Sequence, residues 1–382
     1  MKRIVLVVML VSILAVAFIA PTHTTLITAY SATAEATEAS TETAGYQGPL
    51  DKELNVYNWA DYIDADLLTE YQSKYNVKIN YDNFASDEEL LAKIQAGATG
   101  YDVIFPDDYM VARMIELNLL GKIDKANIPN IENIDPYNLN AWYDPGNLYC
   151  IPWQWGTTGI AYLASLEKPP TSWAALFDPV QAKYYSEHGG INLLDNQRDV
   201  IAAALVYLGY EVNDSDPAHL NQARDTVLKI LPFIHSFNAT DYPTTLLVPK
   251  EVAVSQAWNG DVAKSALETV SDKNPKGEWR YFVPKEGGVR YQDNVCITAT
   301  TKHKATAEHF INFIIDGQAA ARTSNFTGYV SANKAAEPFT KPEVLAFSPQ
   351  LDALEKLQWI KPLDDATTKL YDQIWTEIRA TP

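Results

Sequence analysis

The order of secondary structure predicted along the chain limits its fold more than any other feature of the sequence. Strand patterns occur at 53–58, 77–81, 101–105, 191–194, 252–258 and 291–298. Helical patterns occur at 66–74, 86–97, 109–120, 200–208 and 367–378. Alternating strands and helices form a mainly parallel sheet that helices cover on both faces. The sequence therefore predicts an α/β protein, and 382 residues are enough for two domains.

The helix that begins near residue 86 has a recognisable start and end. Ser86 and Glu89 form a capping box, in which the Ser hydroxyl accepts a bond from the Glu89 amide and Glu89 reaches back to the Ser86 amide. Gly97 and Gly100 follow, and we expect them to end the helix.

The N-terminal segment has the pattern of an export signal. Two basic residues precede an apolar run at 4–20, which is at the short limit for a membrane span. We predict a signal peptide at 1–34 that is cleaved after a small-residue site, and an uncleaved anchor is the alternative. Residues 35–49 are rich in Thr, Ala and Glu and are expected to form a flexible tether.

Charge and cysteine content restrict the partners and the type of stabilisation. Thirty Lys and Arg against 48 Asp and Glu give a net charge of −18, so nucleic acid is not expected as a partner.

The chain has two cysteines, Cys150 and Cys296, far apart in sequence. They could pair in an exported protein, but the interpretation we favour is two buried free thiols.

Aromatic and acidic residues recur just after the predicted strands. Ligands of open α/β sheets bind beyond the carboxyl ends of the strands, so these residues are candidates for one site. Those at strand ends are Trp59, Tyr62, Asp107, Tyr109, Asp199, Trp258 and Asp261, and Asp293 lies within a strand pattern, flanked by Tyr291. Carboxylates attract ammonium groups, and aromatic rings attract cations and pack against methylene groups. The set therefore suits a linear alkyl amine.

A structural role for the acids is the alternative at each position. Asp residues after strands often cap the following helix or lie in its first turn, where the helix dipole favours them. This interpretation applies to Asp107, Asp108, Asp195 and Asp199.

Patterns typical of enzymes are absent from the sequence. It contains no Gly-x-Ser-x-Gly elbow, no phosphate-binding loop and no His-Glu-x-x-His motif, and its six His residues lack metal-ligand spacing. We therefore expect no catalysis, no metal and no cofactor. A secreted carbohydrate-active enzyme is the alternative, because paired carboxylates and aromatic walls also suit sugars.

Five short motifs give the chain a resemblance to a known family. They are LNVYNWADY at 54–62, YDVIFPDDY at 101–109, IPWQWGTTG at 151–159, AWNGD at 257–261 and PKEGG at 284–288. In this order they resemble the spermidine/putrescine-binding proteins of ABC importers, and the similarity extends from about residue 53 to 380.

The resemblance implies a class II periplasmic-binding-protein fold, in which two α/β lobes are joined by two crossing hinge segments. Lobe 1 would contain 50–157 plus 293–335, and lobe 2 would contain 158–292 plus 336–382. It further implies an exported monomer, in the periplasmic space or at the outer face of the cytoplasmic membrane. Its partners would be a polyamine, putrescine or spermidine, and the membrane permease of an ABC importer. A protein of the same fold for another cationic small ligand is the alternative.

The family's ligand-binding positions match the nine candidates above and add Tyr329, near a hinge. Three positions depart from the pattern: Asp107 stands where some members have Ser, Asn196 where spermidine-preferring members have Asp, and Asp199 where Glu is usual. These departures leave the preferred polyamine open. A further polar contact near Lys361 and Asp364 cannot be aligned.

Overall fold

The computed structural model describes residues 45–97, 100–349 and 353–381. The predicted signal peptide at 1–34 and most of the predicted tether at 35–49 lie outside the described residues. Residues 45–49, the described end of that tether, form no helix or strand. Within the described ranges, we find no helix that is both long and apolar enough to span a membrane.

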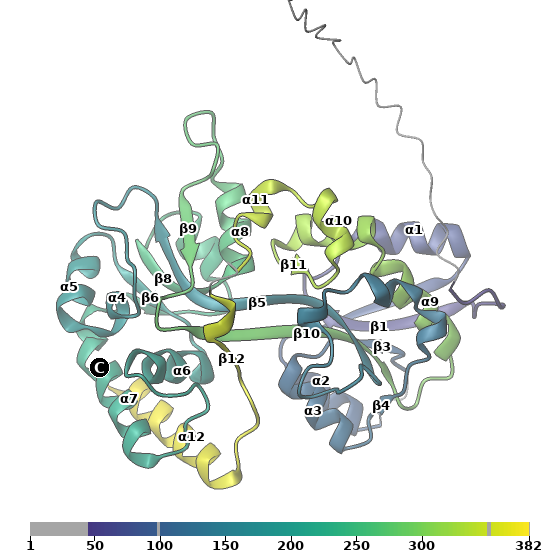
Figure 1. Ribbon diagram of the computed structural model, residues 1–382, viewed down its shortest axis with the longest axis horizontal. Coiled ribbons are helices and arrows are strands. Elements are labelled where there is room, and N and C mark those ends of the chain that lie inside the picture. The colour runs from purple at the N-terminus through teal and green to yellow at the C-terminus, as the bar shows by residue number, and fades with distance from the viewer. Residues whose placement is uncertain (1–44, 98–99, 350–352, 382) are drawn as a thin grey trace, which may run out of the picture. The chain divides into compact units, whose positions relative to one another are not determined.

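All the predicted strands and helices are present, with shifted ends, and several elements are added (Figure 1). The strands are β1 (Glu53–Trp59), β2 (Lys78–Phe84), β3 (Val103–Ile104), β4 (Leu120–Gly121), β5 (Cys150–Leu163), β6 (Ile191–Leu193), β7 (Ser236–Phe237), β8 (Val254–Trp258), β9 (Trp279–Phe282), β10 (Gly288–Thr298), β11 (Val330–Ser331) and β12 (Leu357–Trp359). The α-helices are α1 (Ala65–Tyr75), α2 (Asp87–Gln95), α3 (Asp108–Glu116), α4 (Ala174–Phe177), α5 (Pro179–Glu187), α6 (Gln197–Tyr207), α7 (Pro217–Ile230), α8 (Asn259–Glu268), α9 (Lys304–Ile314), α10 (Gly317–Thr327), α11 (Pro342–Leu345) and α12 (Asp365–Ala380).

The strands form one sheet with the order β2-β1-β3-β10-β5-β8-β6-β7. At one end β1 pairs in parallel with β2 and β3, and at the other end β6 pairs in parallel with β7 and β8. Between them, β5 and β10 pair antiparallel with each other and with their outer neighbours, β8 and β3. The α/β fold is confirmed, and two long strands connect its parallel halves (Figure 1).

The sequence pattern did not predict β5 as a strand, although it has 14 residues. Nearly all of its residues are buried, so apolar and polar residues do not alternate along it. A strand that is covered on both faces lacks the period of two that identifies a half-exposed strand. Gly156 and Gly159 weaken the pattern further.

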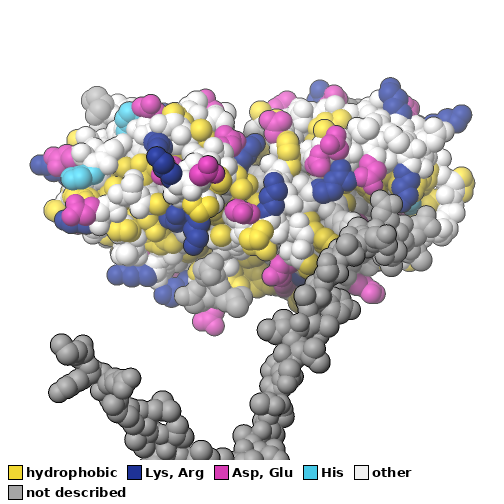
Figure 2. Space-filling view, turned by 90° about the horizontal axis from the view of Figure 1, so that it is seen from above, with side chains coloured by type: hydrophobic (Ala, Val, Ile, Leu, Met, Phe, Trp, Pro, Cys, Tyr) yellow, Lys and Arg dark blue, Asp and Glu magenta, His cyan; other side chains and the backbone are white. Residues whose placement is uncertain are grey.

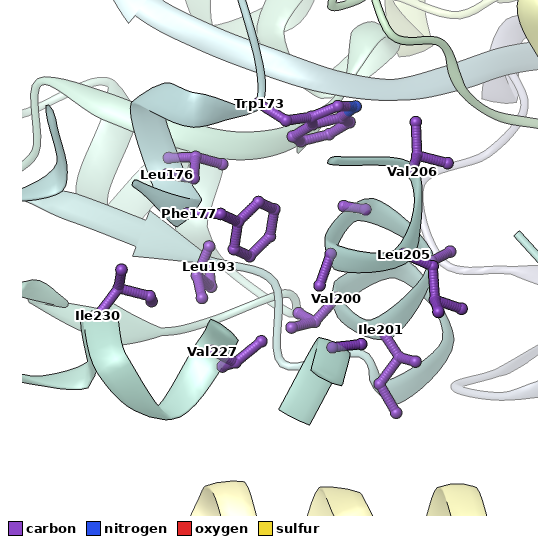
Figure 3. Packing of buried hydrophobic residues seen from close by; sticks show 14 of the residues in the cluster. Trp173, Leu176, Phe177, Leu193, Val200, Ile201, Leu205, Val206, Val227 and Ile230 are labelled. Atoms are coloured by element: carbon purple, nitrogen blue, oxygen red, sulfur yellow. The ribbon is translucent and has the colours of Figure 1, made fainter. Parts of the chain in front are cut away.

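Separate hydrophobic clusters hold the two ends of the sheet. In one, the residues of α6 from Val200 to Val206 are all buried and pack against Trp173, Phe177 and Leu193 (Figure 3). In the other, Tyr71 of α1 contacts Phe310 of α9 edge to face, with ring centroids 5.0 Å apart. Burying one large apolar side chain contributes about 1.5–3 kcal/mol, so these clusters fix the strand ends in place.

The capping box at the start of α2 is half confirmed. The Ser86 hydroxyl accepts a hydrogen bond from the Glu89 amide at 3.2 Å, as predicted. The Glu89 carboxylate instead accepts from the amide of Ala85, at 2.9 Å. The Glu89 carboxylate thus reaches the amide one residue before the cap.

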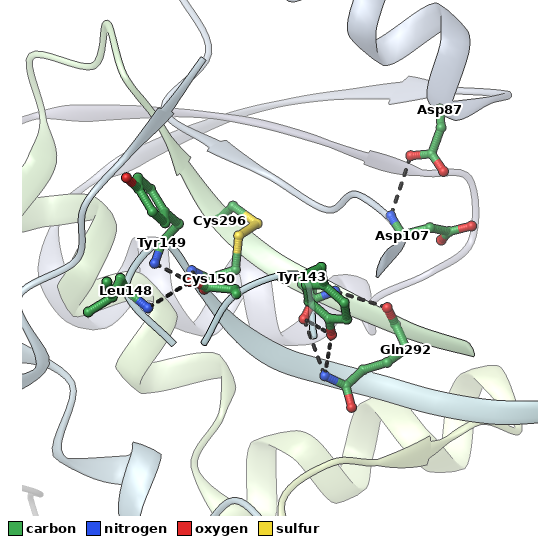
Figure 4. Close-up of a disulfide and its surroundings, with 10 residues drawn as sticks. Asp87, Asp107, Tyr143, Leu148, Tyr149, Cys150, Gln292 and Cys296 are labelled. Atoms are coloured by element: carbon green, nitrogen blue, oxygen red, sulfur yellow. Dashed lines mark hydrogen bonds between the residues drawn. A yellow bond between two sulfur atoms is a disulfide. The ribbon is translucent and has the colours of Figure 1, made fainter. Parts of the chain in front are cut away.

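The free-thiol interpretation of the two cysteines is wrong. Cys150 and Cys296 form a disulfide, with their Cα atoms 4.3 Å apart (Figure 4). The two residues are directly opposite each other where β5 pairs with β10, and both are buried. Their separation of 146 residues concealed this proximity, because it arises from antiparallel pairing of two distant strands.

Candidate functional site

All ten predicted site residues line one cavity of about 710 Å³. They are Trp59, Tyr62, Asp107, Tyr109, Asp199, Trp258, Asp261, Tyr291, Asp293 and Tyr329. Seven of them lie at or just after the ends of β1, β3, β6 and β8, Tyr291 and Asp293 belong to β10, and Tyr329 directly precedes β11. The cavity therefore lies where the strand-end rule places a ligand site.

Trp59 ends β1, and its orientation is fixed on two sides. Its indole Nε1 donates a hydrogen bond to the carbonyl of Phe105 at 2.9 Å. Its ring lies against Phe84, with centroids 4.5 Å apart. The ring is therefore held as part of the wall rather than free to rotate.

Asp293 lies at an irregularity in β10, between Gln292 and Asn294, where the pairing with β5 shifts in register. Its carboxylate accepts a hydrogen bond from the Tyr62 hydroxyl. It also faces Asp107 across an isolated antiparallel bridge. The bulge thus turns one acid of β10 toward the loop that follows β3.

Asp199 is buried in the first turn of α6. Its carboxylate accepts a 2.5 Å hydrogen bond from the Thr158 hydroxyl, and its amide donates to the Asn196 side chain at 3.1 Å. Burial raises the pKa of Asp199 to about 6. Asn196 lines the cavity and is also the cap of α6.

Asp261 and Tyr329 connect α8 to the segment before β11. The Tyr329 hydroxyl donates to the Asp261 carboxylate at 2.8 Å, and burial raises the pKa of Asp261. The Tyr329 ring lies 5.8 Å from that of Tyr62 and 6.4 Å from that of Tyr291, edge to face in both pairs. Three tyrosine rings therefore form one aromatic wall between the acids.

The structure does not support a helix-capping role for the Asp107 side chain. Asp107 occupies the cap position of α3, but its side chain makes no capping hydrogen bond. Asp195 forms an ion pair with Arg379 and is 43% exposed, so it neither caps α6 nor lines the cavity. Asp364 is the cap of α12, through a 2.8 Å bond from the Thr367 amide, and Lys361 lies over the Trp142 ring.

Sequence reasoning missed three groups that orient the predicted residues: Asp87, Thr158 and Tyr242. Asp87 accepts a bond from the Asp107 amide, Thr158 binds Asp199, and the Tyr242 hydroxyl accepts from the Trp258 amide at 3.1 Å. Asp87 was hidden inside the capping-box pattern, and no local pattern distinguishes Thr158 or Tyr242.

Gly260 allows the aromatic wall to form. A Cβ atom at this position would lie 2.2 Å from Cδ1 of Tyr329, so the ring would have to move. We expect Gly260→Ala to lower the free energy of unfolding by about 1–2 kcal/mol, because overpacking costs about 1–3 and the better helix propensity of Ala returns up to about 1. Urea unfolding would measure this loss.

Gly100→Ala is the matched control, because a Cβ at Gly100 would meet no atom within 4 Å. We expect this variant to stay within about 0.5 kcal/mol of the parent protein. Equal stability of the Gly260→Ala and parent proteins would contradict the tight contact with Tyr329.

The cavity lining is strongly acidic. Among the described residues that line it, nine are Asp or Glu and two, Arg198 and Lys264, are basic. Arg198 donates to the Asn213 side chain and the Lys361 carbonyl and lies over the Tyr371 ring. The outer face in Figure 2 instead shows basic and acidic side chains interspersed. The arrangement can hold a cation between carboxylates and aromatic rings.

A family model and individual relatives both match this chain over most of its length. Residues 66–351 match the family model described as bacterial extracellular solute-binding protein. The spermidine/putrescine-binding periplasmic protein 1 of Haemophilus influenzae is 33% identical over 350 residues, covering 90% of this chain and 93% of that protein. The putrescine-binding periplasmic protein SpuD of Pseudomonas aeruginosa is 30% identical over 346 residues, covering 87% and 94%.

A solved structure agrees with these relatives. The spermidine/putrescine ABC transporter substrate-binding protein PotD of Streptococcus pneumoniae has a TM-score of 0.76 and 31% identity, covering 86% of this chain and 99% of that one. The family match spans more than half of the chain, and the relatives align over almost their full length. This chain therefore belongs to the bacterial extracellular solute-binding protein family.

Proposed function

We propose that this protein captures a polyamine, putrescine or spermidine, in the cavity and delivers it to the membrane permease of an ABC importer. It is an exported solute-binding protein and not an enzyme. The two relatives described above are named as putrescine-binding and spermidine/putrescine-binding periplasmic proteins. The observation that carries the proposal is one cavity lined by nine acids, three of them buried, together with tyrosine and tryptophan rings.

The chemistry of that lining fits an alkyl amine with charged ends. Asp293 and Asp107 lie at one part of the cavity, bridged through their backbones, and Asp199 and Asp261 belong to helices that follow β6 and β8. Each pair would bind an ammonium group, while Trp59, Trp258 and the tyrosines contact the methylene groups. The spacing of the acids would then select ligand length.

Ligand binding would favour a closed form of the protein. In this proposal lobe 1 (50–157 plus 293–335) and lobe 2 (158–292 plus 336–382) turn about β5 and β10. A ligand that contacts both lobes stabilises closure through contacts that the open form lacks. The protein would act as a monomer, and the permease would recognise its closed form.

A thermal-shift panel tests the proposal. Putrescine, cadaverine, spermidine and spermine are compared with lysine and arginine as basic controls. A ligand at about 100 times its Kd adds ~2.7 kcal/mol to the free energy of unfolding, so a true ligand raises the melting temperature clearly. We expect at least one polyamine to do so and the amino acids to have little effect. A flat panel for all four polyamines would reject the proposal.

A further inference from the structure

Asp107 and Asp293 form a carboxyl pair within the cavity. Their backbones meet in an isolated antiparallel bridge, and both side chains line the cavity. Asp293 is 6% exposed, and Asp107 is partly buried. Although Asp107 stands at the cap position of α3, its side chain makes no capping hydrogen bond with that helix.

Two further acids, Asp87 and Asp108, accept hydrogen bonds from the backbone at this pair. The Asp107 amide donates to Oδ1 of Asp87 at 3.4 Å (Figure 4). The Gln292 amide donates to Asp108 at 3.2 Å. Asp87 is 1% exposed, and its Oδ2 is buried without a hydrogen-bond partner among the described residues. The pair is therefore surrounded by further buried carboxyl groups.

The other titratable groups around the pair do not supply a positive charge. Three tyrosines interact with it electrostatically: Tyr62, Tyr109 and Tyr291. Glu88 adds a further carboxylate beside Asp87 and Tyr109. Two arginines act on the neighbouring Asp108. The guanidinium of Arg290 is enclosed between the rings of Tyr137 and Trp359, at 4.0 and 3.9 Å. Arg198 lines the cavity and donates to the Asn213 side chain and the Lys361 carbonyl.

Two carboxylates that face each other across such a bridge, shielded from water, repel each other when both are ionised. Burial raises the pKa of Asp293, and the neighbouring Asp107 raises it further. Burial likewise raises the pKa of Asp107, with the charge of Asp87 acting in the same direction. Such pairs commonly retain one proton between them, as in aspartic proteases.

We propose that Asp107 and Asp293 share one proton while the cavity is empty, and that a ligand ammonium group displaces this proton when it binds. The inference rests on the proposed function. The empty pair carries one negative charge, and the occupied pair carries two, balanced by the ammonium. The ligand enters already protonated, since alkyl amines titrate near pH 10, and the displaced proton goes to the solvent. Ligand uptake is thereby coupled to proton release.

Isothermal titration in buffers of different ionisation enthalpy measures this release directly. Putrescine is titrated at pH 7.5 into the parent protein and into Asp107→Asn, which keeps the shape of the side chain and removes the carboxyl group that shares the proton. We expect the parent to release about one proton per putrescine and Asp107→Asn to release less than about 0.3. Asp272→Asn, an exposed acid outside the cavity, is the control and keeps the parent value.

The pH dependence of affinity gives a second readout. Release of one proton makes the Kd of the parent fall by up to about tenfold per unit as pH rises from 7 to 8. This window lies above the pKa of about 6 at Asp199. Asp107→Asn should lose most of that slope. Binding heats that do not depend on buffer, or equal release by Asp107→Asn, would overturn the inference. The second result would assign the proton to Asp87 or Asp108, whose pKa values burial raises to about 8.

The two proposals fail in different ways. If polyamine binding itself is wrong, putrescine, cadaverine, spermidine and spermine all fail to bind the parent protein in every buffer. If only the proton coupling is wrong, putrescine binds with the same heat in each buffer, after dilution is subtracted.

Discussion

Replacing Asp293 with Asn should weaken polyamine binding by about 10- to 150-fold. Asp293 is nearly buried in the cavity, and the Tyr62 hydroxyl fixes the direction of its carboxylate. A hydrogen bond to a charged group contributes about 1.5–3 kcal/mol, which corresponds to this range in Kd. Because Asp107 keeps one negative charge beside it, we expect weakened binding rather than complete loss.

Calorimetric titration of the best ligand from the thermal-shift panel measures this effect. Asn has nearly the same size as Asp and still accepts from Tyr62, so the fold should be retained, and circular dichroism verifies it. Asp272→Asn removes one charge at an exposed position outside the cavity and should change Kd less than twofold. Comparable affinity for Asp293→Asn and the parent protein would show that Asp293 does not contact the ligand.

Removing the disulfide should produce the largest loss of stability. The bond between Cys150 and Cys296 joins β5 to β10 across 146 residues. In the chain-entropy description, a loop of this length restricts the unfolded state by about 5 kcal/mol, and native disulfides typically contribute about 2–5. We therefore expect the double variant Cys150→Ala, Cys296→Ala to lose about 2–5 kcal/mol of unfolding free energy.

Denaturant unfolding with and without reductant separates this effect from cavity formation. Reductant should destabilise the parent protein and leave the double variant unchanged, because the variant has no bond to reduce. The residual difference between the reduced parent and the variant reports the loss of two buried sulfur atoms. If reductant does not change the stability of the parent, the disulfide does not stabilise the fold.

The aromatic and acidic positions were predictable because each depends on its immediate sequence. Trp59, Asp107, Asp199 and Trp258 follow predicted strands, and the rule for open α/β sheets places such residues at one edge. The groups that orient them were not predictable. Thr158 lies on β5, which had no strand pattern, and Tyr242 reaches the cavity wall from a segment with no recognisable motif.

The α/β class, the alternating elements at the two ends of the sheet and most of the side chains that line the cavity could be predicted from the sequence. These features follow from periodicity and from residues only a few positions apart. Three contacts could be found only in the folded chain: Asp107 faces Asp293, Cys150 bonds to Cys296, and Tyr329 donates to Asp261. Each of these contacts joins residues far apart in the chain. The bulge in β10 places Asp293 opposite Asp107, and the register of β10 with β5 places Cys296 opposite Cys150. Such pairings between distant segments leave no local periodic signal in the sequence.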